Sequence, residues 1–214
     1  MANLASDKYQ ADLELVRKIA VKADSVSMAR FLAQDLVIET KPDSSPVTDA
    51  DKATEKAIRE ILESERPKDG ILGEEFGAFI TGKNRYWVID PIDGTKSFLR
   101  GLPVWSTLIA LVEVNGSSHE VVVGLVSSPA LARTWFATKG GGAYTTFATQ
   151  NKGQPRKINV SKVSEIKDAH VGYSDFVGFG NRLNGFQSII NEAWRTRAFG
   201  DFWSHMLVAE GVMD

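Results

Sequence analysis

Two carboxylates three residues apart follow an apolar run in the segment Trp87-Val-Ile-Asp90-Pro-Ile-Asp93-Gly94-Thr95. The proline rigidifies the turn, and Gly94 permits a close approach of the backbone. Carboxylate and carbonyl oxygens are hard ligands that suit Mg²⁺, with water or substrate phosphate completing the octahedron. Gly94 and Thr95 open a short helix-like segment, whose free N–H groups favour a phosphate. The segment therefore predicts a metal and an anion held at one turn, although an acidic surface turn with a helix cap is the simpler alternative.

Two further acidic segments precede this turn. Glu74 and Glu75 follow the short apolar run Ile71-Leu72, where they either supply another metal ligand or form ordinary solvated surface charge. Asp49 and Asp51 lie at a helix start after Thr48, a plausible N-cap, so their simplest role is capping and interaction with the helix dipole. Being two positions apart, Asp49 and Asp51 cannot both point the same way on that helix.

Composition excludes several other chemistries. The 214 residues include no cysteine, which removes disulfides, thiolate zinc sites, iron–sulfur clusters and cysteine nucleophiles. The three histidines are widely spaced, which argues against a histidine-rich zinc site. A net charge of −2 without a basic stripe argues against a general nucleic-acid binder. We expect no membrane span, no secretory signal and a cytoplasmic location, because no apolar run of 18 residues and no basic region followed by an apolar run occurs.

Hydrophobic periodicity predicts an α/β chain of layered α+β type. We expect one domain over 1–214 with two α/β halves, about 1–150 and 151–214, and a meander sheet in the first half. The expected helices are Asp7–Gln34, Asp49–Glu63, Asn181–Trp194 and Phe202–Glu210. The expected strands are Ile71–Leu72, Tyr86–Ile89, Thr107–Val114, Val121–Ser127, Thr134–Ala137, Ala143–Thr146, Ala169–Tyr173 and Arg197–Phe199, with hairpin loops at Asn115-Gly116 and Gly140–Gly142 and a polar loop at Lys41–Pro46.

The three acidic segments, taken in this order, resemble the inositol monophosphatase superfamily of Mg²⁺-dependent, lithium-sensitive phosphatases. The matching motifs are Val47-Thr48-x-x-Asp51, Gly73-Glu74-Glu75 and Asp90-Pro-Ile-Asp93-Gly94-Thr95. The third motif is the most specific, and the resemblance extends from the first helix almost to the end of the chain. It implies the layered α-β-α-β-α sandwich of that superfamily.

The resemblance also implies a role for each matching residue. Glu74 and Asp90 would bind a first Mg²⁺, helped by the main-chain carbonyl of Ile92, and Asp90 would bridge to a second ion bound by Asp93. Two or three ions are expected in all. Gly94 and Thr95 would hold the phosphate through backbone N–H groups. Asp51 would orient Thr95, so that this pair positions and deprotonates the water that attacks phosphorus in line.

Two later segments resemble the bacterial histidinol-phosphate phosphatase branch of the superfamily: Lys96-Ser-Phe-Leu-Arg100-Gly101 and Arg197-Ala-Phe-Gly200-Asp201-Phe202-Trp203. This implies Arg100, Gly200 and Asp201 as substrate-binding residues. Asp201 has a physical rationale, because histidinol phosphate carries an ammonium group and an imidazole that a carboxylate can pair with. Capping of the helix that starts at Phe202 is the alternative role.

Alternatives in function remain open at this stage: an inositol monophosphatase or broad sugar-phosphate phosphatase, a 3′-phosphoadenosine nucleotidase, or an inactive metal- and phosphate-binding remnant. The last arises because the family pattern continues to a Trp-Asp motif that completes the second metal site, whereas this sequence stops at Gly211-Val-Met-Asp214. We therefore expect a C-terminally truncated family member with an incomplete second site, and Asp214 is too early in the pattern to replace the missing ligand. The resemblance also implies a homodimer acting on a small phosphorylated substrate.

Overall fold

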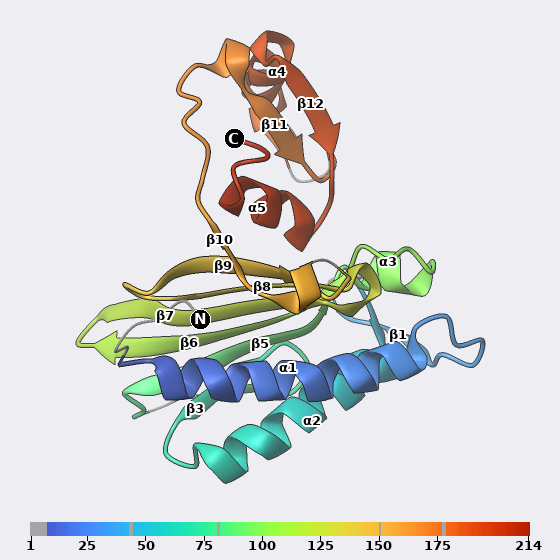
Figure 1. Ribbon diagram of the computed structural model, residues 1–214. Helices are drawn as coiled ribbons and strands as arrows, with labels where there is room; N and C mark the ends of the chain where they lie inside the picture. Colours follow the sequence, from blue (N-terminus) through green and yellow to red (C-terminus); the bar gives the residue numbers. More distant parts are fainter. Residues whose placement is uncertain (1–7, 43–44, 81, 150, 177–178) are drawn as a thin grey trace. The chain divides into compact units, whose positions relative to one another are not determined.

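The computed structural model describes residues 8–42, 45–80, 82–149, 151–176 and 179–214 (Figure 1). The chain divides into two compact units, residues 1–156 and 157–214, and each is described by itself. No helix in these ranges is both long enough and apolar enough to cross a bilayer.

A mixed sheet forms the centre of the first unit. Strands β5 to β9 make an antiparallel meander, in agreement with the sequence, while β3 lies parallel to β5 and antiparallel to the edge strand β4. Both predicted hairpin loops are present between paired strands. The eight strands, in the spatial order β10-β9-β8-β7-β6-β5-β3-β4, are β3 (Gly70–Gly73), β4 (Gly77–Phe79), β5 (Arg85–Asp93), β6 (Ser106–Asn115), β7 (Ser118–Ser128), β8 (Arg133–Thr138), β9 (Gly142–Phe147) and β10 (Arg156–Ile158).

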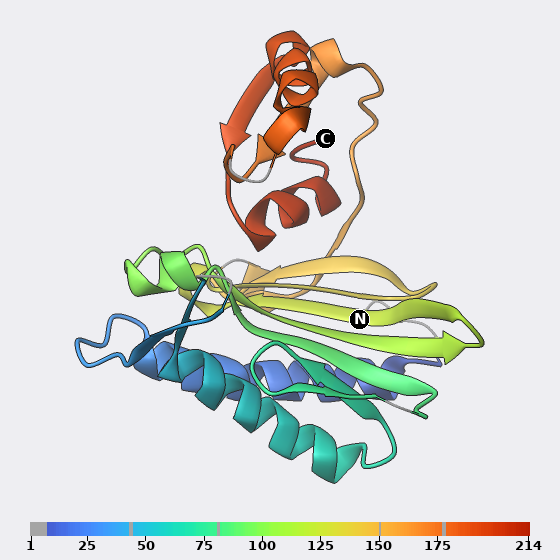
Figure 2. The ribbon, with the colours of Figure 1, turned by 180° about the vertical axis from the view of Figure 1, so that it is seen from behind.

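Helices α1 (Gln10–Arg30) and α2 (Asp49–Glu65) lie side by side against one face of this sheet (Figures 1 and 2). Apolar residues at helical spacing in both helices meet alternate residues of the strands, which is the packing that the two periodicities dictate. The resulting core contains Leu13, Val16, Ile19, Ala20 and Ala23 of α1, Ile58 and Leu62 of α2, and Trp87, Ile89, Ile109, Leu111 and Leu125 of the sheet.

The first helix is shorter than the sequence predicts. It ends at Arg30 because Phe31 is extended and Leu32 takes a φ of 67°, which a helix cannot continue through. Met28 and Leu32, which helical spacing would place on the same apolar face as Leu13 and Val16, are 40% and 62% exposed, so the core face stops near Ala23 and Ser27. The predicted start at Asp7 lies outside the described residues.

A two-stranded antiparallel ribbon, β1 (Ile38–Thr40) with β2 (Pro46–Thr48), joins the two helices. The sequence predicts only a loop here, because three-residue strands carry too little periodicity to detect. Asp43 and Ser44 of that loop lie outside the described residues. Next to the ribbon, a second apolar cluster of Ala50, Ile92, Phe98 and Trp105 anchors the acidic turn and the short helix α3 (Thr95–Leu99).

The second unit contains a parallel pair of strands, β11 (His170–Tyr173) and β12 (Arg195–Ala198), with helices α4 (Leu183–Glu192) and α5 (Phe202–Ala209). The predicted helix from Asn181 starts as a 3₁₀ turn, and the predicted strand at Arg197 begins two residues earlier. Four 3₁₀ turns occur in the described parts of the chain, at Pro129–Leu131, Asn151–Gly153, Ile166–Asp168 and Gly180–Arg182.

Candidate active site at the end of strand β5

The acidic turn is a bulge in the sheet. Asp90 pairs with Leu108 of β6, but the next pair is Asp93 with Ser106, so β5 has one residue more than its partner over this step. The Thr107 hydroxyl donates to the main-chain oxygen of Pro91 over 2.9 Å, which holds the bulge. Bulges re-aim side chains at sheet ends. This bulge therefore changes the directions in which the side chains of Asp90 and Asp93 leave the end of the strand.

Three other carboxylates act on Asp90. Burial raises the pKa of Asp90, and the charges of Glu74, Asp93 and Asp51 together with a hydrogen bond to Glu74 raise it further, to about 9. The Oδ1 atom of Asp90 is buried and has no hydrogen-bond partner. A buried oxygen that has no hydrogen-bond partner and is surrounded by negative charge would be stabilised by a bound cation. Oxygen donors of this kind fit Mg²⁺, although the described residues form no preassembled cage of three or more metal-ligating side chains.

Lys41, from the turn after β1, supplies a positive charge beside Glu74 and Glu75. Its Nζ lies 2.6 Å from Oε1 of Glu74 and 2.8 Å from Oε1 of Glu75. Burial alone would lower the pKa of Lys41, but the hydrogen bonds from its ammonium to both glutamates raise it above the ordinary value. Sequence reasoning missed this residue, since a lone lysine in a polar loop gives no signal of what it contacts.

Replacing Lys41 by Met is expected to tighten Mg²⁺ binding about fivefold or more, because an ammonium that competes for Glu74 is removed. Isothermal titration with Mg²⁺ in the absence of substrate measures this directly. The control is Lys52→Met, which removes an exposed lysine that pairs with Glu39 instead. Weaker Mg²⁺ binding in Lys41→Met would show that the lysine supports the ion rather than competing with it.

Asp51 combines the two roles considered from the sequence. It is 1% exposed, and its Oδ2 accepts from the backbone N–H of Thr48 over 2.8 Å, completing a capping box at the start of α2. Its other oxygen, Oδ1, accepts from the Thr95 hydroxyl over 3.2 Å, while Ile92 O is a second acceptor for that hydroxyl at 3.1 Å. Burial raises the pKa of Asp51. Capping therefore fixes Asp51 in position beside Thr95.

Asp49 points elsewhere, as the helical spacing predicts. Its carboxylate lies 2.9 Å from Arg30 and accepts from the backbone N–H of Val37 over 3.2 Å. Gly94 is the N-cap of α3 with a φ of 92°, a conformation that favours glycine and turns the chain sharply after Asp93. The expected metal and phosphate residues thus lie together at one end of β5. Arg100, expected to bind substrate, is exposed at the C-cap of α3.

Glu55 is a supporting residue that sequence reasoning missed. It is fully buried in α2, where its Oε2 accepts from the backbone N–H of Glu75 over 2.7 Å and its Oε1 from Nε of Arg59 over 2.7 Å. A Cβ added to Gly73 would lie 1.8 Å from Glu55, so glycine is required there. An acid on the buried side of an amphipathic helix, one turn after Asp51, was the available signal.

Replacing Glu55 by Gln is expected to lower the free energy of unfolding by about 1–3 kcal/mol. The amide NH₂ cannot accept a hydrogen bond, so not all of the N–H groups of Glu75, Arg59 and Phe76 that donate to Glu55 keep an acceptor. Urea unfolding followed by circular dichroism measures the loss. Glu60→Gln, on the same helix, is the control. A variant as stable as wild type would mean that water replaces the lost interactions.

Gly200 and Asp201 lie in the second unit, directly before α5. Asp201 occupies the N-cap position of α5, but its side chain makes no capping hydrogen bond, so the capping role considered from the sequence is wrong. Its backbone has φ 60° and ψ −147°, a region that residues other than glycine rarely enter. Such strain is kept where the position of the side chain matters.

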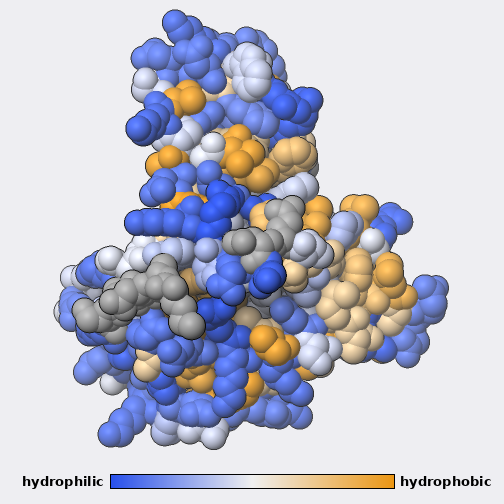
Figure 3. Space-filling view, in the orientation of Figure 1, coloured by the Kyte–Doolittle hydropathy of each residue, from blue (hydrophilic) through white to orange (hydrophobic). Residues whose placement is uncertain are grey.

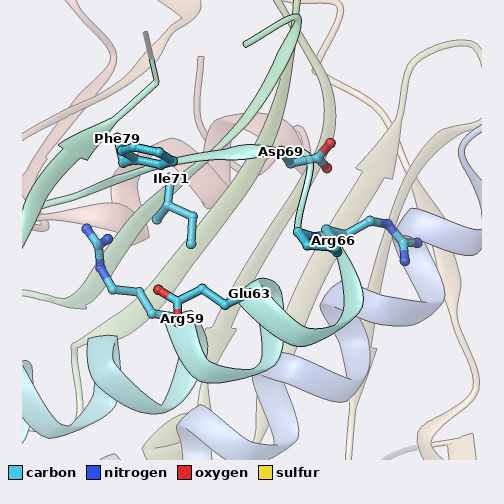
Figure 4. A pocket seen from close by; sticks show the side chains of 7 residues that line it. Arg59, Glu63, Arg66, Asp69, Ile71 and Phe79 are labelled. Atoms are coloured by element: carbon cyan, nitrogen blue, oxygen red, sulfur yellow. The ribbon is translucent and has the colours of Figure 1, made fainter. Parts of the chain in front are cut away.

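A cavity of about 290 Å³ lies away from these carboxylates, between the second half of α2 and strands β3 and β4 (Figure 4). Its two arginines are engaged within the protein. Arg59 binds Glu55 and Gly77 O, and Arg66 binds Asp12. In Figure 4 the side chain of Arg66 points away from Ile71 and Phe79. The residues around this cavity therefore offer no counterpart to the chemistry at Asp90.

Comparison with known proteins gives consistent matches. The model of the inositol monophosphatase family matches residues 8–214. A histidinol-phosphatase of Streptomyces coelicolor is 50% identical over 96% of this chain and 77% of its own length. A histidinol-phosphatase of Mycobacterium tuberculosis is 47% identical over 95% of this chain and 76% of its own length.

Solved structures show the same fold. The extragenic suppressor protein SuhB of Bartonella henselae superposes with a TM-score of 0.82 at 28% identity, over 96% of this chain and 77% of that one. An IMPase of Thermotoga maritima gives a TM-score of 0.80 at 29% identity, over 96% and 75%. The fold predicted from the sequence is thereby confirmed. The chain belongs to the inositol monophosphatase family of phosphoric monoester hydrolases, which are metal-dependent and generally use Mg²⁺.

Proposed function

We propose that this protein hydrolyses histidinol phosphate to histidinol and phosphate in a Mg²⁺-dependent reaction of histidine biosynthesis. The observation that carries the catalytic part is the buried, unpartnered Oδ1 of Asp90 amid the charges of Glu74, Asp93 and Asp51. The substrate part is supported by relatives named histidinol-phosphatase at 47% and 50% identity.

In this proposal Glu74, Asp90, Asp93 and the carbonyl of Ile92 hold two or three Mg²⁺ ions. Bound Mg²⁺ would polarise the phosphoryl group and neutralise charge that develops on its oxygens. The Ile92 oxygen can serve although Thr95 donates to it, since a carbonyl has two lone pairs.

The other residues handle the phosphate and the proton. Backbone N–H groups of Gly94 and Thr95 bind phosphate oxygens at the start of α3. The Thr95 hydroxyl orients the attacking water. Its oxygen accepts the proton of that water while its own proton passes to Oδ1 of Asp51, 3.2 Å away. Burial makes Asp51 a better base than an exposed aspartate, because it raises the pKa of that carboxyl.

In this proposal Asp201 and Gly200 bind the end of the substrate that carries the ammonium or imidazolium, and Arg100 is a separate substrate-binding residue. A carboxylate held in a strained backbone conformation supports this assignment for Asp201. Inositol phosphate has no cation for Asp201 to bind, so the proposal predicts discrimination between the two substrates.

The test is phosphate release from histidinol phosphate, myo-inositol 1-phosphate and glycerol 2-phosphate, with and without Mg²⁺. The proposal expects the highest kcat/KM with histidinol phosphate and no turnover after chelation of the metal. Equal rates on all three substrates would leave a broad phosphatase. A preference for the inositol ester would agree with the relative named inositol monophosphatase from Dictyostelium discoideum, which is 33% identical.

We also propose a cytoplasmic homodimer. Figure 3 shows hydrophobic residues gathered on the first unit beside α3 and the segment between α1 and β1. The exposed apolar side chains of these segments are Leu32, Val37, Ile38 and Leu102. An apolar surface of this kind supports self-association, and sedimentation equilibrium of wild type and Val37→Glu tests it.

A further inference from the structure

A second cavity lies in the first unit, on the sheet face that α1 covers. Its volume is about 150 Å³, enough for a molecule the size of benzene. The floor comes from three neighbouring strands, β7, β8 and β9, and the roof from α1. The lining residues are Arg17, Ala20, Val21 and Asp24 of α1 with Leu125, Ser127, Thr134, Phe136 and Thr146 of the sheet.

The floor is ordered by the strand register. Ser127 is the direct partner of Thr134, and Thr134 is the direct partner of Thr146, so three hydroxyl-bearing residues form one row across the sheet. The adjacent row, Leu125 and Phe136, is apolar and buried. One end of the cavity is therefore rich in hydroxyls, and the other end is apolar.

Asp24 of α1 lines the hydroxyl-rich end of the cavity. One carboxylate oxygen, Oδ2, accepts from the Ser127 hydroxyl over 2.8 Å, while Oδ1 is buried without a hydrogen-bond partner. Burial raises the pKa of Asp24 to about 6, against the lowering effect of the bond from Ser127. Its carboxylate is thus mostly ionised at neutral pH, and the single bond from Ser127 leaves the desolvation of Oδ1 uncompensated.

No cation of the described residues balances this charge. Arg17 also lines the cavity, but it precedes Asp24 by two helical turns, about 10 Å along the axis. Its guanidinium lies 5.0 Å from the centre of the Phe136 ring, at the apolar end. The charge of Asp24 is therefore not neutralised by a cationic side chain of the described residues.

We propose that this cavity is a second binding site, for a small protonated primary amine whose ammonium donates to the carboxylate of Asp24 and to the hydroxyl row. An ammonium has three N–H donors, which matches one carboxylate oxygen and neighbouring hydroxyl acceptors. The site is separate from the Asp90 cluster, since it uses none of its residues.

Titration calorimetry with protonated 2-aminoethanol at pH 7.5 tests the proposal, with saturating Mg²⁺ so that the amine does not enter the acidic cluster at Asp90. We expect binding to wild type, at least about tenfold weaker binding to Asp24→Asn, and weaker binding to Thr134→Val. Glu14→Gln, which alters an exposed acid of the same helix, should bind as wild type does. Ethylene glycol, similar in size but neutral, should not bind.

Asp24→Asn is expected to fold at least as stably as wild type at pH 7.5, because it removes a desolvated charge and its amide oxygen still accepts from Ser127; thermal melting checks this. Absence of 2-aminoethanol binding in the millimolar range would overturn the proposal. So would equal binding to Asp24→Asn, which places the amine elsewhere, or equal binding of ethylene glycol, which reduces the cavity to a hydrated pocket.

Discussion

Asp90→Asn is expected to lower kcat/KM for histidinol phosphate by at least about a hundredfold, because it removes one full charge from the oxygen ligands at the centre of the site. Asp35→Asn, which alters an acid whose side chain is 82% exposed, is the control and should keep wild-type turnover. Retention of more than a tenth of wild-type activity at saturating Mg²⁺ would show that the metal does not depend on Asp90.

The same substitution is expected to stabilise the metal-free protein. The pKa of Asp90 is raised from 3.8 to about 9, so the folded state retains a proton that the unfolded state loses between these pH values. The stability of the wild-type protein therefore falls as the pH rises through this window, and the Asn variant lacks this loss. Without Mg²⁺, Asp90→Asn should melt at a higher temperature than wild type at pH 8, with the difference shrinking toward pH 4.

Added Mg²⁺ should reverse that order. The ion binds the folded wild type and raises its melting temperature by mass action, while the Asn variant responds little. A variant that is less stable than wild type at pH 8 without metal would mean that Asp90 is held by favourable contacts rather than strained by its neighbours.

The first unit could be predicted from the sequence to within a few residues at most boundaries, because its helices and strands are long and periodic. Thr48 is an example of a boundary that the sequence predicts, because a threonine followed three residues later by the acid Asp51 indicates the capping box that the structure contains. Local rules failed where tertiary contacts decide. Leu32 ends α1 with a positive φ, and three-residue strands such as β1 are visible only through their partner β2.

The residues of the candidate site likewise fall into those that local sequence patterns predict and those that only tertiary contacts reveal. Glu74 follows β3, and Asp90 and Asp93 lie at the end of β5. All three belong to recognisable motifs, so their types and order indicated the chemistry. Lys41 and Glu55 act through contacts with residues 20 or more positions away, 33 for Lys41 with Glu74 and 20 for Glu55 with Glu75. Such pairings depend on how the ribbon and α2 dock on the sheet, and no local pattern in the sequence records them.

Substrate choice is tested at Asp201, where the backbone determines which variant is informative. Its φ of 60° and ψ of −147° lie in a region that glycine alone enters readily, so a β-branched replacement such as Thr adds strain, whereas Asn has the shape of Asp and leaves the backbone strain as it is. Asp201→Asn therefore removes the charge with little change in conformation. Asp201→Gly removes the side chain and relieves the backbone, so it should fold at least as stably as wild type.

We expect Asp201→Asn to lower kcat/KM for histidinol phosphate at least about tenfold, since loss of one partner from a desolvated charge pair costs about 2–5 kcal/mol and 1.4 kcal/mol is one decade. Hydrolysis of glycerol 2-phosphate, which has no cationic group, should stay near the wild-type rate, because Asp201 is assigned to the end of the substrate remote from phosphorus. Asp201→Gly should show the same selectivity loss despite its relieved backbone. If both variants instead lose activity equally on the two substrates, Asp201 supports the fold around α5 rather than the substrate, and the assignment to histidinol phosphate gives way to a broad phosphatase.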